Sequence, residues 1–556
     1  MSLGGRAQHL ADVEMTITGA TAPVELWMPV WTPGAYELRT WGRNVTPVGA
    51  SDEAGRKLAV ARTGPSTFRV DGGGTIRVRY RVYAAKLSDD GSQVDAGHAL
   101  LNGSSILLAV RGQERGLHEL RIELPSGWRA ATALEEDAGG GWSATSYEQI
   151  IDGPIECGRF VEATARAAGR SYRIVVDGAP SVPARFVEDV ARIAAAEARI
   201  AGAPPYHRYV VVVHLADEAG RVAALEHAAS TSIIVPRKSF ADPDAYDELI
   251  YVVAHELFHA WNAKRLRPAE LVPYDLLHAQ LSRSLWITEG LTEYFAHRAM
   301  LAAGRWNRAA YLAHVSDEAA RADEAARVGL SVEQAAELTW QPPDDTADDW
   351  DAYYARGHLI ALAVDAAMRV RTGGKHTLDE VLRGELLDAE RAGGIAPIDS
   401  ARLARAVDAL APGAGALLTR SVNEANETPL VRAAIAAIGL SLQCAASARV
   451  VAGFSAEREG DSLRVLAVGD GGPADLAGLK PGDRILSLDG AAPEPRWPDK
   501  IAHAAAGAPL VLEVVRGQRP LELHLTLETE QDSACKLTQA PATPAITRLR
   551  EQLLTP

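Results

Sequence analysis

The chain has 556 residues, 47% hydrophobic and 23% charged, which is typical of a soluble globular protein with about three or four domains. Its formal net charge is −15, so we do not expect the basic surface that non-specific binding to nucleic acid or to an anionic membrane requires. No apolar run approaches the length of a membrane span.

The first 180 residues have the pattern of a β-rich domain. Short runs such as 75–84 and 171–178 alternate apolar and polar residues and are broken by Gly, Asp and Pro, whereas long helical patterns are absent. We therefore predict an antiparallel, sandwich-like domain over residues 1–180.

Residues 181–440 are predicted to form a mainly helical domain. Residues 183–202 are rich in alanine with apolar positions at helical spacing, and residues 208–217 are typical of a buried strand. Helical patterns dominate from residue 241 to about residue 440, so this segment is the candidate for a catalytic domain.

A small third domain is predicted over residues 441–528. Residues 462–490 favour a strand, a short helix and a second strand separated by turns, and residues 509–528 favour a closing hairpin. The tail, 529–556, has little pattern and is expected to fray or to pack on the surface. The fold class predicted for the whole chain is multidomain α+β.

The three cysteines, Cys157, Cys444 and Cys535, are too few for a disulfide framework and show no CxxC spacing. Cys444 and Cys535 bracket the small domain, so one bridge there is an option, but unpaired thiols are the interpretation that we favour. The first residues lack the basic region and apolar core of a signal peptide. The sequence leaves the compartment open between the cytoplasm and, if an export signal was removed, the periplasm.

The motif HELFH at residues 255–259 indicates a metal site. Residues four apart lie on one face of a helix, so His255 and His259 can offer imidazole nitrogens to one ion. Glu256 points about 100° away and can act as a general base on a water molecule bound to that ion. A chance match on an exposed helix is the alternative, but the apolar residues around the motif favour the metal site.

A catalytic zinc ion requires a third protein ligand and an open fourth position. The segment LWITEGLTEYF, residues 285–295, supplies Glu289 and Glu293 on one helix face, with Gly290 allowing close helix packing. One glutamate can bind the metal, and the other can accept the outer N–H of a ligand histidine. The alternative is that both glutamates are solvated on an amphipathic helix. The apolar residues 285–287, which precede them, disfavour that alternative.

These motifs together resemble the M61 (glycyl aminopeptidase) family of gluzincin metallopeptidases. HELFHAWNAKRLRP and LWITEGLTEYF carry the resemblance, together with MPVWTPGAYELRTWGRNV at 28–45, AALEHAASTSIIV at 223–235 and DAYYARGHLIALAVD at 351–365. The chain is more distantly similar to the M1 aminopeptidases and to thermolysin. The resemblance implies a thermolysin-like catalytic domain within residues 181–440.

The resemblance also implies a role for each matching residue. The implied ligands of one Zn²⁺ per chain are His255, His259 and Glu289. Glu256 is the implied general base, and Glu293 is the implied carboxylate behind a ligand histidine. Tyr354 matches the tyrosine that donates a hydrogen bond to the oxyanion, with Tyr353 as a rival. Aromatic packing is the structural alternative for both tyrosines.

Glu226 matches the family glutamate that pairs with the free α-amine of a peptide substrate, which would select the N-terminal residue. Ala223 and Ala224 stand where the family has two glycines, so the amine site here can differ in geometry. Arg265 is a candidate for binding a substrate carboxylate, but capping the end of the preceding helix, or packing, is the role that we slightly favour for an arginine there.

Residues 471–490, GGPADLAGLKPGDRILSLDG, resemble a PDZ domain of the kind attached to bacterial proteases. PDZ domains bind extended peptides along the edge of a sheet, so a peptide ligand is implied. Residues 450–455, with Gly453 and Phe454 at their centre, are the candidate carboxylate-binding loop. A structural PDZ domain with a blocked groove is the alternative.

The sequence therefore predicts a zinc metallopeptidase acting on peptide or protein substrates, and by resemblance an aminopeptidase that removes small N-terminal residues such as Gly or Ala. A zinc endopeptidase using the same site is one alternative. A PDZ-mediated peptide-binding protein with a vestigial zinc site is another. A structural zinc site is disfavoured because such sites usually fill all four positions with Cys or His, and no cysteine lies nearby in sequence.

Overall fold

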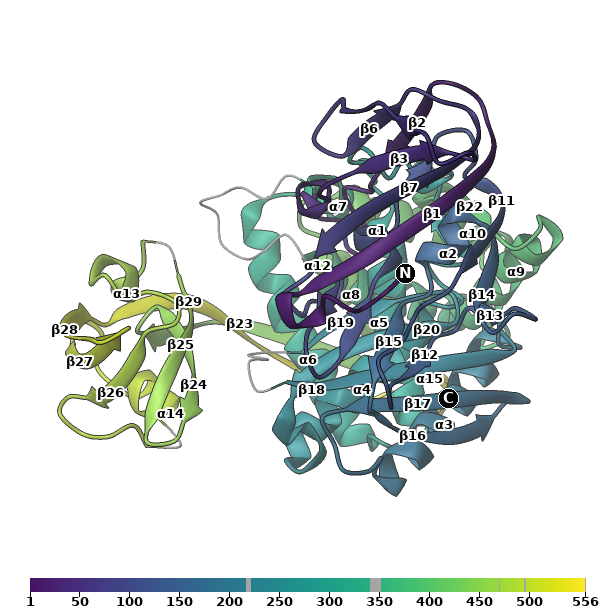
Figure 1. Ribbon diagram of the computed structural model, residues 1–556. Coiled ribbons are helices and arrows are strands. Elements are labelled where there is room, and N and C mark those ends of the chain that lie inside the picture. Colours follow the sequence, from purple (N-terminus) through teal and green to yellow (C-terminus); the bar gives the residue numbers. More distant parts are fainter. Residues whose placement is uncertain (217–221, 341–351, 470, 495–496, 556) are drawn as a thin grey trace.

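The structure of the protein, a computed structural model, describes residues 1–556 except 217–221, 341–351, 470, 495–496 and 556. One continuous hydrophobic core runs through most of the molecule, and a second core lies within residues 450–527. The part with the second core stands apart from the rest and is joined to it by strands β23 (Leu440–Val451) and β29 (Glu528–Gln539) (Figure 1).

The N-terminal part is β-rich, as predicted. Its strands are β1 (Leu10–Ala20), β2 (Val24–Trp27), β3 (Gly49–Asp52), β4 (Lys57–Leu58), β5 (Val60–Arg62), β6 (Thr67–Val70), β7 (Gly74–Tyr83), β8 (Gln93–Val94), β9 (Ala99–Leu101), β10 (Ala109–Val110), β11 (Arg115–Leu120), β12 (Arg129–Ala131), β13 (Glu135–Glu136), β14 (Trp142–Ser146) and β15 (Ile155–Gly158). They form antiparallel sheets with the orders β1-β7-β3-β4, β10-β2-β6-β5, β11-β14-β13 and β12-β15-β9-β8. In β7, Ile76, Val78, Tyr80 and Val82 are buried and the residues between them are exposed, which explains the alternating pattern. The helices of this part, α1 (Gly103–Ile106) and α2 (Tyr147–Ile151), are short.

A five-stranded mixed sheet follows. Its strands are β16 (Val161–Ala167), β17 (Arg170–Asp177), β18 (Arg208–Ala216), β19 (Ala223–Glu226) and β20 (Ser230–Pro236), in the order β16-β17-β18-β20-β19. The three central strands are parallel, and both edge strands are antiparallel to their neighbours. The central strand β18 is buried along nearly its whole length, which accounts for its run of valines. β17 ends before residue 180 and pairs with β18, so this sheet crosses the predicted domain boundary.

Helices surround and extend this sheet. They are α3 (Ala184–Ala201), α4 (Pro243–Phe258), α5 (Leu285–Ala302), α6 (Arg308–Ala325), α7 (Val332–Leu338), α8 (Ala352–Thr372), α9 (Leu378–Arg391), α10 (Ser400–Leu410), α11 (Ala414–Asn423) and α12 (Thr428–Ala437). Two short strands, β21 (Leu266–Pro268) and β22 (Ala396–Ile398), pair in parallel. Helices α5 and α8 are buried over most of their lengths and pack against each other, so they form the centre of this part.

The small C-terminal body has the arrangement that its sequence predicts. Its elements are β24 (Phe454–Glu459), β25 (Ser462–Val468), α13 (Pro473–Leu476), β26 (Arg484–Leu488), α14 (Trp497–Ala502), β27 (Pro509–Arg516) and β28 (Arg519–Thr526). The five strands form one sheet in chain order, and β27 and β28 are the predicted closing hairpin.

The segment after residue 528, which was expected to fray or to pack on the surface, forms a long strand and a helix. Strand β29 pairs with β23 over its whole length, from Leu440 with Gln539 to Val451 with Glu528. Helix α15 (Pro544–Leu553) follows and returns to the main core through buried Leu549 and Leu553. The buried residues of the paired strands, Leu440, Leu442, Ser533 and Leu537, lie towards one end of the ribbon, so the apolar alternation is too short to have revealed the strands.

Cys444 and Cys535 lie opposite each other in this ribbon and form a disulfide between positions that are 91 apart in sequence. The preference for unpaired thiols is therefore wrong for this pair. Sequence spacing could not reveal the contact, because it depends on the register between two strands at the two ends of an inserted body. Cys157 is free and buried.

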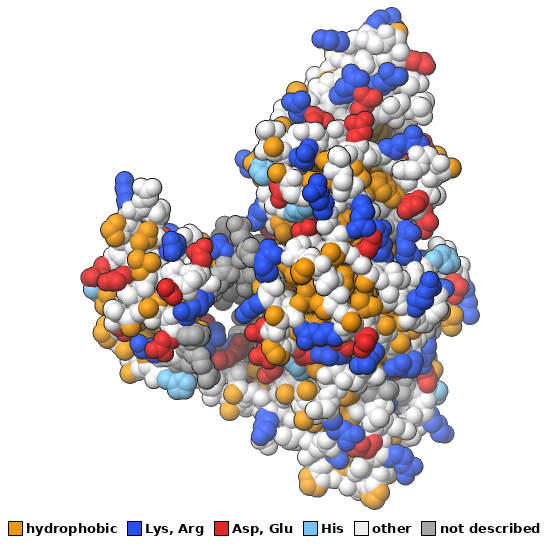
Figure 2. Space-filling model, turned by 60° about the horizontal axis from the view of Figure 1, so that its bottom comes forward, with side chains coloured by type: hydrophobic (Ala, Val, Ile, Leu, Met, Phe, Trp, Pro, Cys, Tyr) orange, Lys and Arg blue, Asp and Glu red, His pale blue; other side chains and the backbone are white. Residues whose placement is uncertain are grey.

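Basic and acidic side chains are interspersed over the face of the molecule shown in Figure 2, with hydrophobic side chains gathered between them. No helix among the described residues is long and apolar enough to cross a membrane.

Candidate active site

Helix α4 presents the two histidines of the HELFH motif. The helix begins at Pro243 and is capped by Asp242, whose carboxylate accepts hydrogen bonds from the backbone of the first turn. It ends at Phe258, so His255 lies in the last turn and His259 is the capping residue. The Nε2 atoms of the two histidines are 2.9 Å apart and point at the same place.

Helix α5 brings a carboxylate to the two imidazoles. Oε2 of Glu289 lies 3.4 Å from Nε2 of His255 and 3.3 Å from Nε2 of His259. Ligands at zinc distances span edges of roughly 3.3 Å in a tetrahedron, so these three atoms form a triangle of the size that one such ion requires. All three residues are buried, and their donor set of two imidazoles and one carboxylate can hold a divalent metal ion.

Protein oxygen atoms lie next to the outer nitrogens of both histidines, on the side away from the Nε2 atoms. Nδ1 of His255 lies 3.2 Å from Oε1 of Glu293, and Glu293 also accepts a hydrogen bond from the hydroxyl of Tyr251. Nδ1 of His259 lies 3.3 Å from the backbone oxygen of Asn262. Carboxylates and carbonyls in this position orient a ligand histidine and fix its tautomer.

Asn262 also ties the end of α4 to α5, a role that the sequence analysis missed. Its fully buried side-chain amide donates to the backbone oxygens of Ile287 and Thr288, at 2.8 and 3.0 Å, and to the hydroxyl of Thr292. These bonds fix the loop after the second histidine against the helix that carries Glu289. An asparagine three residues after HExxH was the only sequence signal for this link.

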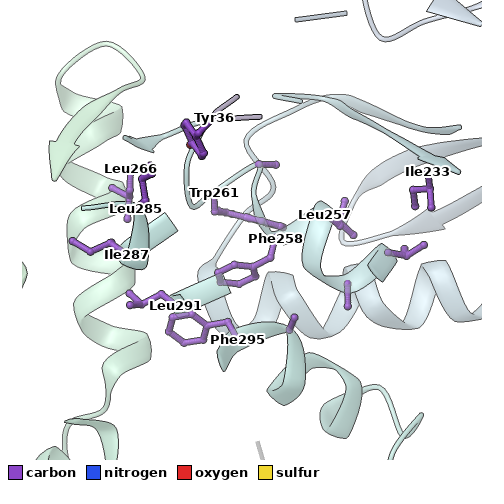
Figure 3. Close-up of a cluster of buried hydrophobic side chains, with 14 of the residues drawn as sticks. Tyr36, Ile233, Leu257, Phe258, Trp261, Leu266, Leu285, Ile287, Leu291 and Phe295 are labelled. Atoms are coloured by element: carbon purple, nitrogen blue, oxygen red, sulfur yellow. The ribbon is translucent and has the colours of Figure 1, made fainter. Parts of the chain in front are cut away.

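Apolar packing holds the same two helices together. The rings of Phe258 and Phe295 stack with centroids 5.0 Å apart, and Leu257, Leu291 and Trp261 belong to the same buried cluster (Figure 3). The polar triangle is thus built on one side of a rigid hydrophobic contact, which limits how far its members can move apart.

Glu256 and Glu226 approach the histidines from another direction. Each offers a carboxylate oxygen within 4.8 Å of the other and of a ring nitrogen of His259. Burial raises the pKa of Glu256 well above its usual value; His259 acts to lower it and Glu226 to raise it. The carboxyl of Glu256 is therefore positioned beside the triangle and tuned to bind a proton more readily than a solvated glutamate.

Glu226, at the end of edge strand β19, sits in a tight polar pocket. A β-carbon on Gly34, which has a φ of +111°, would lie 2.4 Å from Oε2 of Glu226, so only glycine fits there. Nζ of Lys264 lies 4.0 Å from Oε1 of Glu226 and 3.3 Å from Oδ1 of Asp152. Lys264 was missed by the sequence analysis, because nothing in the KRLRP segment distinguishes it from its arginine neighbours.

The two tyrosines of α8 lie at the same site but in different surroundings. The ring of Tyr354 stacks on His255, with centroids 6.1 Å apart and planes 19° apart. Tyr353 is buried and packs against Tyr354. Burial, followed by the nearby carboxylate of Glu289, raises the pKa of Tyr354 well above its usual value, so its hydroxyl keeps its proton and can donate a hydrogen bond.

Arg265 lies elsewhere. Its guanidinium donates to the backbone oxygens of Gly394 and Pro205, at 3.1 and 2.8 Å. It lines a separate cavity of about 560 Å³ together with Arg170 and Arg383, and neither the histidines nor the glutamates of the site line that cavity. The structure does not bring Arg265 to the other site residues, and its contacts match the packing alternative.

Three family models match the chain: the Peptidase M61 N-terminal domain at residues 2–159, M61 glycyl aminopeptidase at residues 248–360, and a PDZ domain at residues 464–516. The second match contains the triangle, Glu256 and both tyrosines. These matches identify the class of protein as a peptidase. More particularly, the resemblance to the M61 family, with a C-terminal PDZ domain, is confirmed.

One solved structure has the same fold over the whole chain. An aminopeptidase N family protein from Idiomarina loihiensis superposes with a TM-score of 0.80 at 24% identity, covering 100% of this chain and 99% of that one. An M1 zinc metallopeptidase from Deinococcus radiodurans is more distant, with a TM-score of 0.47 at 17% identity over 76% of this chain and 90% of that one. No curated protein matches the sequence.

Proposed function

We propose that the protein is a zinc-dependent aminopeptidase that removes small N-terminal residues, such as Gly or Ala, from peptides. The observation that carries this proposal is the triangle formed by His255, His259 and Glu289 beside the carboxyls of Glu256 and Glu226. The triangle would hold one Zn²⁺. A bound zinc ion supplies a Lewis acid for the scissile carbonyl and lowers the pKa of a water molecule.

The residues around the triangle divide the remaining chemistry. Glu256 accepts the proton of the attacking water and passes it to the leaving amine, a role that suits a carboxyl with a raised pKa. Tyr354 donates a hydrogen bond to the carbonyl oxygen as negative charge develops on it. Glu293 keeps the imidazole of His255 in the tautomer whose Nε2 faces inward.

Glu226 would bind the substrate's free α-amine and so set the exopeptidase register. Its carboxylate is buried, and one of its oxygens lies within 4.8 Å of an oxygen of Glu256 and a ring nitrogen of His259, so an amine bound there would lie close to the triangle. Support for a small residue comes from the match to M61 glycyl aminopeptidase.

An endopeptidase is the second candidate, because Lys264 already lies 4.0 Å from Glu226. If this lysine forms an ion pair with the carboxylate, Glu226 has a structural role and the site has no fixed partner for an α-amine.

The third candidate is peptide binding at the C-terminal body. There β24 is the edge strand of its sheet, the position at which PDZ domains add a peptide strand, and Phe454 stacks on Trp497 of α14 with centroids 5.2 Å apart.

The test compares hydrolysis of Gly-, Ala- and Leu-p-nitroanilide with that of their N-acetylated forms, using the wild type and Glu256→Gln. The proposal expects cleavage of the free-amine substrates alone, with Gly or Ala ahead of Leu. Glu256→Gln should retain its metal but lose about 10²- to 10⁴-fold in kcat. Cleavage of acetylated substrates at similar rates would favour the endopeptidase. Binding of peptides without turnover would favour the PDZ alternative.

A further inference from the structure

A second group of metal-binding side chains lies apart from the active site, where two sheets meet. His98 directly precedes β9 and Glu156 lies in β15, so both belong to the sheet β12-β15-β9-β8. Asp177 ends β17 and is the register partner of His214 in β18. The four residues share no member with the triangle of His255, His259 and Glu289.

Three of these side chains converge on one point, and Glu156 lies next to one of them. His98, Asp177 and His214 each offer a ligand atom within 4.8 Å of the other two. Oε2 of Glu156 lies 3.5 Å from Nε2 of His214, close to the edge of roughly 3.3 Å expected between two ligands of one tetrahedral zinc ion. The rings of His98 and His214 are 5.5 Å apart between centroids.

The polar atoms of this group lack hydrogen-bond partners among the described residues. They are Nε2 of His98, both ring nitrogens of His214 and both carboxyl oxygens of Glu156. Glu156 is 0% exposed, His214 is 1% exposed and His98 is 9% exposed. Five buried, unsatisfied polar atoms in one place are unfavourable in a folded protein unless something binds them.

His98 is held in the orientation of a ligand histidine. Its Nδ1 lies 3.3 Å from Oδ2 of Asp95, whose other oxygen accepts a hydrogen bond from the backbone N–H of His98. The carboxylate thereby leaves Nε2 directed into the group. The same arrangement, a carboxylate behind the outer nitrogen, orients His255 in the active site.

A proton alone does not account for the group. A protonated Glu156 could donate one hydrogen bond to the neighbouring imidazole nitrogen of His214. That pair would satisfy one oxygen and one nitrogen, leaving Nε2 of His98, the second nitrogen of His214 and the second oxygen of Glu156 without partners. A divalent cation would be neutralised by the two carboxylates and coordinated by both imidazoles.

We propose that His98, Glu156, Asp177 and His214 form a second metal site, which binds Zn²⁺ or a similar first-row divalent ion and joins the N-terminal β-part to the central sheet. Two imidazoles with two carboxylates favour such an ion over Ca²⁺ or Mg²⁺, which prefer oxygen ligands alone. His98, Asp177 and His214 would hold the ion, and Glu156 beside His214 would close the fourth position, so we assign the site a structural rather than a catalytic role.

The test is the metal content of the full-length protein after dialysis against metal-free buffer, measured by mass spectrometry. Wild type is expected to hold two equivalents. The His98→Gln and Asp177→Asn proteins should each hold one equivalent fewer than wild type, because the ion of the second site is lost. The His259→Gln protein should lose the ion of the active site and keep the ion of the second site. The His259→Gln protein loaded with Co²⁺ should show the visible absorption of cobalt bound by nitrogen and oxygen, and adding His98→Gln should abolish it.

The proposal is overturned if His98→Gln and Asp177→Asn both keep the wild-type metal content, or if Co²⁺ gives no absorption in His259→Gln. If His98→Gln or Asp177→Asn fails to fold, the cobalt spectrum of His259→Gln still shows whether the second site binds a metal ion. The wild type could hold one equivalent that persists in His259→Gln and disappears in His98→Gln. That result would support the second metal site and contradict zinc at the active site, so the two proposals fail separately.

Discussion

Gly290 of α5 and Gly357 of α8 touch through their backbones: a β-carbon on Gly290 would lie 2.4 Å from the Cα atom of Gly357. Gly290 directly follows Glu289, and Gly357 comes three residues after Tyr354. The crossing point of the two helices therefore sets the distance between the third corner of the triangle and the proposed oxyanion donor. No side chain fits between the helices there.

We expect Gly290→Ala to force α5 and α8 apart. The overpacked contact should destabilise the protein by about 1–3 kcal/mol. It should also lower kcat/KM by roughly tenfold or more, because small displacements of catalytic groups are costly. Thermal unfolding and p-nitroanilide hydrolysis measure the two effects.

Gly384→Ala is the matched control, since Gly384 lies within helix α9 and has nothing within 4 Å of an added β-carbon. It should be neutral or stabilising by up to about 1 kcal/mol, with unchanged activity. Equal stability and equal activity of the two variants would contradict the prediction, because they would show that the helix crossing tolerates a β-carbon.

Tyr354→Phe tests which tyrosine donates to the oxyanion. Tyr354 stacks on His255, whereas Tyr353 is buried behind it. Removing the hydroxyl of Tyr354 should lower kcat by about 10²- to 10³-fold with little change in KM, because the bond strengthens only in the transition state. Tyr353→Phe is the control and should keep most of the activity. The reverse ranking of the two variants would assign the role to Tyr353.

Glu226→Gln tests the amine site. Losing a charge-assisted hydrogen bond should lower kcat/KM for free-amine substrates by about 10- to 100-fold, while any slow cleavage of acetylated substrates should stay unchanged. Measuring both substrates on the same preparation separates loss of recognition from loss of fold. If Glu226→Gln changes both activities equally, the carboxylate supports the structure through Lys264 rather than the substrate.

Much of the candidate site could be predicted from sequence because its parts are local. The spacing of His255 and His259 places both on one helix face without any tertiary information. The spacing of Glu289 and Glu293 does the same but leaves their roles undecided. The structure separates the two, since Glu289 faces both Nε2 atoms and Glu293 faces Nδ1 of His255.

The parts that could not be predicted depend on contacts between distant segments. Lys264 lies near Glu226 only because the loop after α4 passes the end of β19. Strand β29 is polar over most of its length, so its apolar alternation is too short to mark it. His98 and His214 are more than a hundred residues apart in sequence, and each alone resembles an ordinary core histidine until two sheets bring them together.

Asp89 predicts how stability depends on pH. Burial, and then the neighbouring charge of Asp90, raise its pKa from 3.8 to about 6. Asp90 itself lies 2.5 Å from Nε of Arg39, which leaves Asp89 as the carboxyl without a close cation among these three residues. The folded chain therefore binds a proton at Asp89 more tightly than the unfolded chain does. Stability is lost as pH rises between these two pKa values, and the loss is complete above about 6.

Asp89→Asn removes this unfavourable charge. It should raise the free energy of unfolding at pH 8 by about 1–2 kcal/mol, a discounted value because the side chain is only partly buried. The advantage should shrink as pH falls from about 6 towards 4, because the wild-type carboxyl is then protonated in the folded state. Urea unfolding at pH 8, 6.5 and 5 measures it. Asp90→Asn, which breaks the contact with Arg39, should instead destabilise the protein at pH 8. A benefit of Asp89→Asn that stays constant across this range would show that charge is not its cause.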